Sequence, residues 1–133
     1  MPKKVLDAYA LMVFFHDEQG ADIVEDLLLD AQDGNKTLLL SVINLGEIWY
    51  SISRTHSPDI ADGYIEEIKA MPISIIDAGW ENSRQAAFYK ARGNISYADC
   101  FAAALAKLND AEVVTGDKEF EILEDDVSIL WLK

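Results

Sequence analysis

Short apolar runs alternate along the chain with longer segments of helical periodicity. We expect the short runs to form strands, at Val5–Leu6, Leu38–Leu40, Ile73–Ile76, Glu112–Thr115 and Val127–Trp131. The longer segments repeat apolar residues every three or four positions, which predicts helices over Ala21–Ala31, Leu45–Arg54, Ile60–Ala70, Ala78–Ala91 and Tyr97–Leu108. Strands that alternate with helices indicate an α/β fold with a mostly parallel sheet.

Length and charge narrow the classes of function. The chain has 133 residues, so we expect one domain over residues 1–133. It carries 11 Lys and Arg against 24 Asp and Glu, a net charge of −13. Proteins that bind nucleic acid or anionic membranes over a broad surface are basic, so both classes are disfavoured. An enzyme that reaches phosphate through bound metal ions is still allowed.

The sequence favours a cytoplasmic protein that does not touch membranes. Cys100 is the single cysteine and cannot form an intrachain disulfide, which fits a reducing compartment. The apolar run at 8–15 is too short to span a bilayer, and His16-Asp17-Glu18 follows it where a secretion signal would have a small-residue cleavage site. His16 and His56 lack the spacing of a zinc motif.

Acidic residues follow predicted strands or open predicted helices at four places, namely Asp7, Glu47, Asp99 and Asp117. In open parallel sheets, ligands bind at the carboxyl ends of the strands, where the strand order reverses. The neighbours of these acids are strongly apolar, and an unpaired buried charge is costly. A hard divalent cation, Mg²⁺ or Mn²⁺, is the simplest common partner for such carboxylates.

Each acid also has a local explanation. Asp7 and Asp117 stand where an N-cap residue is favoured. The spacings Asn44-x-x-Glu47 and Ser96-x-x-Asp99 are those of a capping box. Capping explains each residue singly, whereas a shared metal site explains all of them together.

The chain resembles PIN-domain ribonucleases of the VapC toxin type. The matching segments occur in the order of that family and are spread over nearly the whole chain: Val5-Leu6-Asp7-Ala8-Tyr9-Ala10-Leu11, Asn44-Leu45-Gly46-Glu47, Ile95-Ser96-Tyr97-Ala98-Asp99-Cys100-Phe101-Ala102-Ala103-Ala104 and Val114-Thr115-Gly116-Asp117-Lys118-Glu119-Phe120. The resemblance implies a five-stranded parallel sheet in the order 3-2-1-4-5, flanked by helices. It also implies that the acids above form the acidic quartet of the family.

In that strand order the third strand is an edge. Asp77, which directly follows the third predicted strand, would then lie away from the reversal point. We therefore expect Asp77 to be the N-cap of the next helix rather than part of the site.

The activity implied by the resemblance is cleavage of RNA phosphodiester bonds by a Mg²⁺- or Mn²⁺-dependent endoribonuclease. Asp7 and Asp99 are expected to bind metal directly, and Glu47 and Asp117 to complete the cluster directly or through water. Asn44 and Thr115 are candidates for groups that orient the carboxylates.

Few cations are available to bind RNA phosphate. The candidates are Arg54, Lys90, Arg92 and Lys118, each of which is also explained as a solubilising surface charge. Trp49, Tyr50 and Tyr97 are candidates to stack on bases, although core or interface packing explains them as well.

The resemblance also implies partners. VapC-type toxins are usually homodimers, each inhibited by a small VapB-like antitoxin whose C-terminal segment covers the acidic site. The helix near the N-terminus and the helix over 45–54, with Ile48, Trp49 and Ile52, are the expected contact surfaces. A PIN nuclease that processes RNA without an antitoxin, or a non-catalytic PIN-like binding module, are the alternatives.

Two other acidic α/β classes fit poorly. A phosphoacceptor receiver domain has paired acids after its first strand, where this chain has Asp7 alone. A haloacid-dehalogenase-type phosphatase has Asp-x-Asp there, where this chain has Asp7-Ala8-Tyr9.

Overall fold

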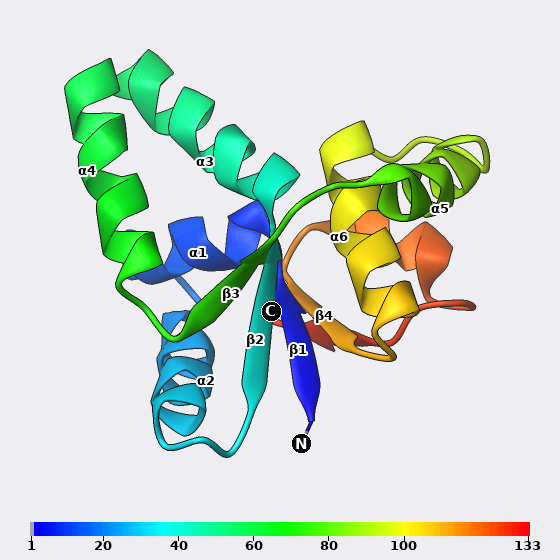
Figure 1. Ribbon diagram of the computed structural model, residues 1–133, viewed down its shortest axis with the longest axis horizontal. Helices are drawn as coiled ribbons and strands as arrows, with labels where there is room; N and C mark the ends of the chain where they lie inside the picture. Colours follow the sequence, from blue (N-terminus) through cyan, green and yellow to red (C-terminus); the bar gives the residue numbers. More distant parts are fainter. Residues whose placement is uncertain (1) are drawn as a thin grey trace.

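Five parallel strands form one sheet with helices on both faces in the computed structural model, which describes residues 2–133 (Figure 1). The strands are β1 (Lys3–Leu6), β2 (Thr37–Ser41), β3 (Ile73–Ile76), β4 (Glu112–Thr115) and β5 (Ile129–Trp131). The helices are α1 (Ala8–Phe15), α2 (Ala21–Gln32), α3 (Val42–Thr55), α4 (Pro58–Lys69), α5 (Trp80–Lys90) and α6 (Tyr97–Leu108), followed by the short 3₁₀ helix η1 (Lys118–Leu123). The α/β class expected from the alternating pattern is confirmed.

The strand order is β3-β2-β1-β4-β5, as the resemblance implied. The chain therefore runs from β1 toward β3 on one side, then crosses to β4 and β5 on the other. Leu6 is in register with Leu40 of β2 and with Val114 of β4. Asp7 and Thr115 are consequently the next residues along two adjacent parallel strands, at the point where the strand order reverses.

Alternate residues of the central strands supply two separate cores. Val5, Leu39 and Val113 belong to the core under α5 and α6. Leu6, Leu40 and Val114 belong to the core under the helices of the other face. Side chains of successive strand residues point to opposite faces, so a strand covered on both sides must be apolar throughout. This is why these strands read as continuous apolar runs.

Helix α3 begins three residues earlier than its periodicity predicted. Ser41, the last residue of β2, caps the helix by accepting a hydrogen bond of 3.2 Å from the Ile43 backbone nitrogen. Asn44 therefore lies inside the helix, and the capping box expected from Asn44-x-x-Glu47 does not form. Because the cap is made by Ser41, the side chains of Asn44 and Glu47 are left for other contacts.

The expected role of Asp77 as an N-cap was wrong. The chain stays extended as far as Gly79, which is the N-cap residue of α5 and offers no side chain for the purpose. Asp77 is exposed just beyond the edge strand β3. Its place at the edge agrees with its exclusion from the reversal point.

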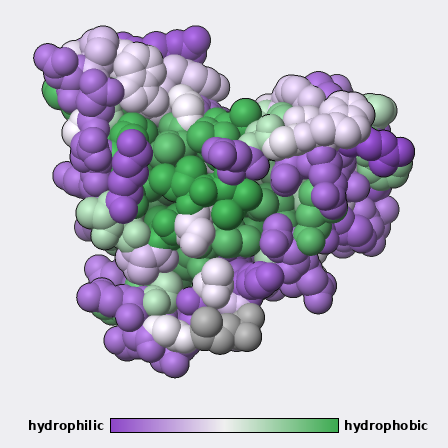
Figure 2. Space-filling view, in the orientation of Figure 1, coloured by the Kyte–Doolittle hydropathy of each residue, from purple (hydrophilic) through white to green (hydrophobic). Residues whose placement is uncertain are grey.

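Helices α3 and α4 pack on each other as a hairpin that projects beyond the sheet, while α5 and α6 pack together on the other side (Figure 1). Between these two pairs the surface is hollowed, and Figure 2 shows apolar residues gathered there with hydrophilic residues around them. Over residues 2–133, no helix has both the length and the apolar character that crossing a bilayer requires.

Candidate active site

Asp7 lies at the junction of β1 and α1, with only 1% of its surface exposed. Its Oδ1 atom accepts a hydrogen bond of 2.8 Å from the Ala10 nitrogen, so the N-cap role expected from the sequence is real. Its Oδ2 atom accepts a hydrogen bond of 2.5 Å from the hydroxyl of Thr115. The Thr115 oxygen in turn accepts from the backbone nitrogen of Asp117, at 3.0 Å. Thr115 thus links the loop after β1 to the loop after β4.

Asp99 is buried in the first turn of α6. Ser96 caps this helix by accepting a hydrogen bond of 3.1 Å from the Asp99 nitrogen. The return bond of a capping box is absent from Asp99, because the Ser96 nitrogen donates to Oε1 of Glu119 instead, at 3.0 Å. The carboxylate of Asp99 therefore accepts no hydrogen bond from the Ser96 nitrogen, although the sequence spacing suggested that it would. It remains available for other contacts.

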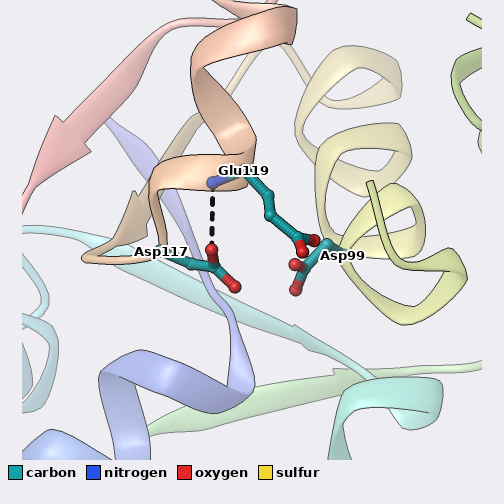
Figure 3. Close-up of side chains that lie close together, drawn as sticks. All are labelled: Asp99, Asp117 and Glu119. Atoms are coloured by element: carbon teal, nitrogen blue, oxygen red, sulfur yellow. Dashed lines mark hydrogen bonds between the residues drawn. The ribbon is translucent and has the colours of Figure 1, made fainter. Parts of the chain in front are cut away.

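Three carboxylates converge closely at the end of β4. One carboxylate oxygen each from Asp99, Asp117 and Glu119 lies within 4.8 Å of the others. Figure 3 shows Asp117 and Glu119 on consecutive parts of the same loop and helix, with the Oδ1 atom of Asp117 accepting from the Glu119 nitrogen at 3.0 Å. Glu119 is not among the site residues expected from the sequence, although its position two residues after Asp117 was the available signal.

Glu47 is half-buried in the second turn of α3. The Asn44 amide nitrogen donates to Oε1 of Glu47 at 3.2 Å and to the Ala98 carbonyl at 3.1 Å. Asn44 therefore joins α3 to the start of α6, immediately beside Asp99. The Oδ1 atom of Asn44 is buried and has no hydrogen-bond partner among residues 2–133.

Burial, with the charges of neighbouring carboxylates, raises the pKa of three acids of the site. Burial, with the charges of Glu47 and Asp117, raises the pKa of Asp7 to about 7 despite its hydrogen bonds from Thr115 and Ala10. Burial and the charges of Asp117 and Asp7 raise the pKa of Asp99 to about 8. Burial also raises the pKa of Glu47, with a further contribution from the charge of Asp117. Each acid is thus within electrostatic reach of the others.

No lysine, arginine or histidine forms an ion pair with Asp7, Glu47, Asp99, Asp117 or Glu119 within the described part of the chain. All the candidate ligand atoms are oxygens. Mg²⁺ and Mn²⁺ prefer oxygen ligands, whereas zinc is more often bound by nitrogen and sulfur. The unpaired Oδ1 atom of Asn44 also needs a donor, and the water shell of a hydrated ion provides donors of that kind. The residues present therefore fit a hard divalent cation.

Two of the four candidate cations are engaged elsewhere. Lys90 donates to the Ile95 carbonyl at 2.8 Å, and Nη2 of Arg92 donates to both carboxylate oxygens of Asp125, at 3.0 and 2.9 Å. Arg54 lies 4.9 Å above the ring of Tyr50 at the far end of α3. Lys118 is exposed next to Asp117 and makes no ion pair within residues 2–133.

The candidate stacking residues differ in exposure. The Trp49 indole donates to Asp62 at 2.9 Å, which ties α3 to α4. Tyr50 and Tyr97 are 45% and 47% exposed, and the Tyr97 ring packs edge-on against Phe101 at 5.0 Å. Trp49 is thus a contact between helices, whereas the two tyrosines are accessible.

Fold and site together define a parallel α/β domain with a carboxylate cluster at the reversal point of the sheet. The family model described as PIN domain matches residues 4–125. The chain belongs to the PIN domain family, which confirms the resemblance drawn from the sequence motifs.

Solved structures share this fold at low sequence identity. A chain of the DNA-bound VapBC from Salmonella typhimurium superposes with a TM-score of 0.78 at 18% identity over 100% of both chains. A chain of VapBC-1 from nontypeable Haemophilus influenzae gives 0.73 at 17% identity over 98% of both. VapC20 of Mycobacterium tuberculosis, a sarcin-ricin loop cleaving toxin, gives 0.69 at 15% identity over 90% of this chain and 94% of that one. No curated protein sequence matches the chain.

Proposed function

We propose that the protein is a Mg²⁺- or Mn²⁺-dependent endoribonuclease and the toxin of a VapBC-type toxin–antitoxin pair. The observation that carries the proposal is how Asp7, Glu47, Asp99 and Asp117 are linked near the reversal point. Thr115 joins Asp7 to Asp117, Asn44 joins Glu47 to the residue before Asp99, and oxygens of Asp99 and Asp117 lie within 4.8 Å. No cationic side chain among residues 2–133 forms an ion pair with them. A structural role alone does not explain this arrangement, because like charges at close range destabilise the fold.

The four acids are the catalytic residues of this proposal and hold the metal, with Glu119 as a fifth candidate ligand. A bound divalent ion supplies a nucleophilic water and stabilises charge on the phosphoryl oxygens. The protein's own contribution is to hold the carboxylates in position. Thr115 fixes the Asp7 carboxylate, and Asn44 fixes Glu47 against the start of α6. Both residues make the orienting contacts that a ligand set needs.

The substrate in this proposal is RNA, which the protein holds through a few local contacts. At a net charge of −13 the surface repels phosphate, so affinity outside the site is weak and salt-sensitive. Lys118 is the candidate cation that lies beside the acids and is free of ion pairs in the described chain.

The proposed partners are a VapB-like antitoxin and a second copy of the chain. Several solved structures of this fold are VapBC complexes, and one is the FitAcB complex of Neisseria gonorrhoeae. The hollowed apolar face in Figure 2 suits a partner segment, and Ile43 and Tyr50 of α3 are exposed apolar residues of the expected contact helix. A basic antitoxin segment would also complement the acidic surface. A cytoplasmic location fits this role.

Cleavage of RNA by carboxylate variants tests the proposal. Purified protein should cut unpaired RNA in Mg²⁺ or Mn²⁺ and not in EDTA. The double variant Asp7→Asn/Asp99→Asn should lose the activity while remaining folded, and Glu66→Gln on the exposed face of α4 should keep it. A folded double variant that still cuts RNA in Mg²⁺ would contradict the proposal. A wild-type protein without cleavage and without saturable Mn²⁺ binding in calorimetry would favour the non-catalytic module.

A further inference from the structure

A cavity of 490 Å³ is lined by both chain neighbours of Asp117, Gly116 and Lys118. Its lining residues come from the loop after β4, from η1 and from the end of the chain, and they are Gly116, Lys118, Glu121, Glu124, Trp131 and Lys133. The lining begins one residue before Asp117. The volume is in the range of small-ligand pockets and accommodates one nucleotide.

Gly116, a residue of the cavity lining, is in close contact with Tyr9. The Tyr9 ring, two residues beyond Asp7, packs on the Gly116 backbone, where an added Cβ would overlap Tyr9 Cε1 and lie 2.8 Å from Cζ. Lys133 Nζ lies 5.2 Å from the centroid of the same ring. Gly116 therefore lines the cavity and also contacts Tyr9 in the first turn of α1, and only glycine permits this contact.

The cavity combines two kinds of charge. Lys118 and Lys133 make no ion pairs with other side chains in residues 2–133, in a protein with only 11 Lys and Arg. Glu124 accepts from the Trp131 indole nitrogen through Oε2 at 3.2 Å, and its Oε1 atom accepts no hydrogen bond from residues 2–133. The Glu121 carboxylate accepts no hydrogen bond within the described chain. A simple anion site would not contain two such carboxylates, because they repel the ligand.

We propose that this cavity binds one unpaired nucleotide adjacent to the cleaved phosphodiester and prefers guanine, an inference that rests on the proposed ribonuclease function. The lysines pair with the flanking phosphate, and the Trp131 indole supplies an aromatic wall for the base. A carboxylate of Glu121 or Glu124 accepts from the adjacent N1–H and N2–H donors of guanine. Uracil presents one N–H between two carbonyl oxygens, and those oxygens repel a carboxylate.

Cleavage of a set of short unpaired RNAs tests the preference. The RNAs differ only in the base at one position, scanned across the cut site. At one flanking position guanine should exceed uracil by roughly 10-fold in kcat/KM, which is the order of discrimination that one bidentate base contact provides. The double variant Glu121→Gln/Glu124→Gln should lose the preference, whereas Glu66→Gln on α4 should keep it. Equal cleavage of all bases at every position would overturn the proposal.

A second measurement separates the cavity from catalysis. The indole N–H resonance of Trp131, identified by its loss in Trp131→Phe, should move on titration with 5′-GMP and much less with 5′-UMP, up to about 10 mM. Lys118→Met should weaken the response, and Lys69→Met on α4 should not. A response to GMP from a protein that cuts no RNA would refute the nuclease and leave the nucleotide site standing. RNA cleavage that does not depend on the base, together with no change in the Trp131 resonance, would refute the nucleotide site and leave the nuclease standing.

Discussion

Asp7→Asn should stabilise the metal-free protein at about pH 8, although it removes a carboxylate proposed to bind metal. Asp7 is buried, and its pKa is raised from 3.8 to about 7. An acid whose folded pKa is raised stabilises the fold below its unfolded pKa, and this contribution is lost as pH rises through the folded value. Between about pH 4 and pH 7 the wild type should therefore lose stability that an uncharged asparagine retains.

The size of the effect follows from the shift. A displacement of about three pKa units at about 1.36 kcal/mol each gives an upper value of roughly 4 kcal/mol above pH 7. Asparagine keeps the acceptor for the Ala10 nitrogen but weakens the bond with Thr115, so the net gain should be about 2 kcal/mol. For 133 residues this corresponds to a rise in Tm of about 7 °C.

Thermal unfolding in EDTA and in saturating Mn²⁺ measures the prediction. In Mn²⁺ at 100 times Kd, the free energy of unfolding of the wild type should rise by about 2.7 kcal/mol and that of the variant by much less. The advantage of the variant over the wild type should therefore shrink or reverse. Asp77→Asn is the matched control, because Asp77 also follows a strand but is exposed at the sheet edge. The reasoning is refuted if Asp7→Asn lowers Tm equally at pH 4 and pH 8 and Mn²⁺ stabilises both proteins alike.

Three further outcomes are expected. Glu119→Gln should weaken Mn²⁺ binding about 10-fold in calorimetry. If its Mn²⁺ affinity instead equals that of the control Glu66→Gln, Glu119 is not a metal ligand. Gly116→Ala should destabilise the protein by about 1–3 kcal/mol in denaturant unfolding because its methyl group meets Tyr9, whereas Gly46→Ala, in open space within α3, should stabilise it by about 0.5–1 kcal/mol. Mn²⁺ affinity should fall as pH is lowered from about 8 to 6, because the two buried aspartates of the site take up protons that the metal must displace, and a pH-independent affinity would contradict their raised pKa values.

Much of the fold could be read from local pattern. The central strands are apolar on both faces, so their runs were visible without knowledge of the sheet, and helical periodicity located the helices from α2 to α6 to within a few residues. The strand order came from the resemblance to a family, since apolar periodicity contains no information on which strands are neighbours.

The capping motifs were less reliable than the strands. A capping box is defined by spacing alone, and the spacing at Asn44 and at Ser96 was correct in both cases. The first did not form because Ser41 capped the helix earlier. The second formed only its forward bond, because Glu119, distant in sequence, accepted the return bond from Ser96. The first case was decided by a neighbouring residue in the sequence, whereas the second was decided by a contact between two segments that only the folded chain brings together.

The acids themselves were evident from the sequence, because each stands next to an apolar element that would bury it. Which carboxylates approach within 4.8 Å, and that Glu119 is among them, depends on how the loop after β4 meets the start of α6. The cavity beside Asp117 likewise joins residues of η1 to the last residues of the chain. Periodicity and local spacing determined the elements and the acids, whereas the distances between side chains far apart in sequence were set by tertiary packing, since close-packed cores fix the relative positions of the elements.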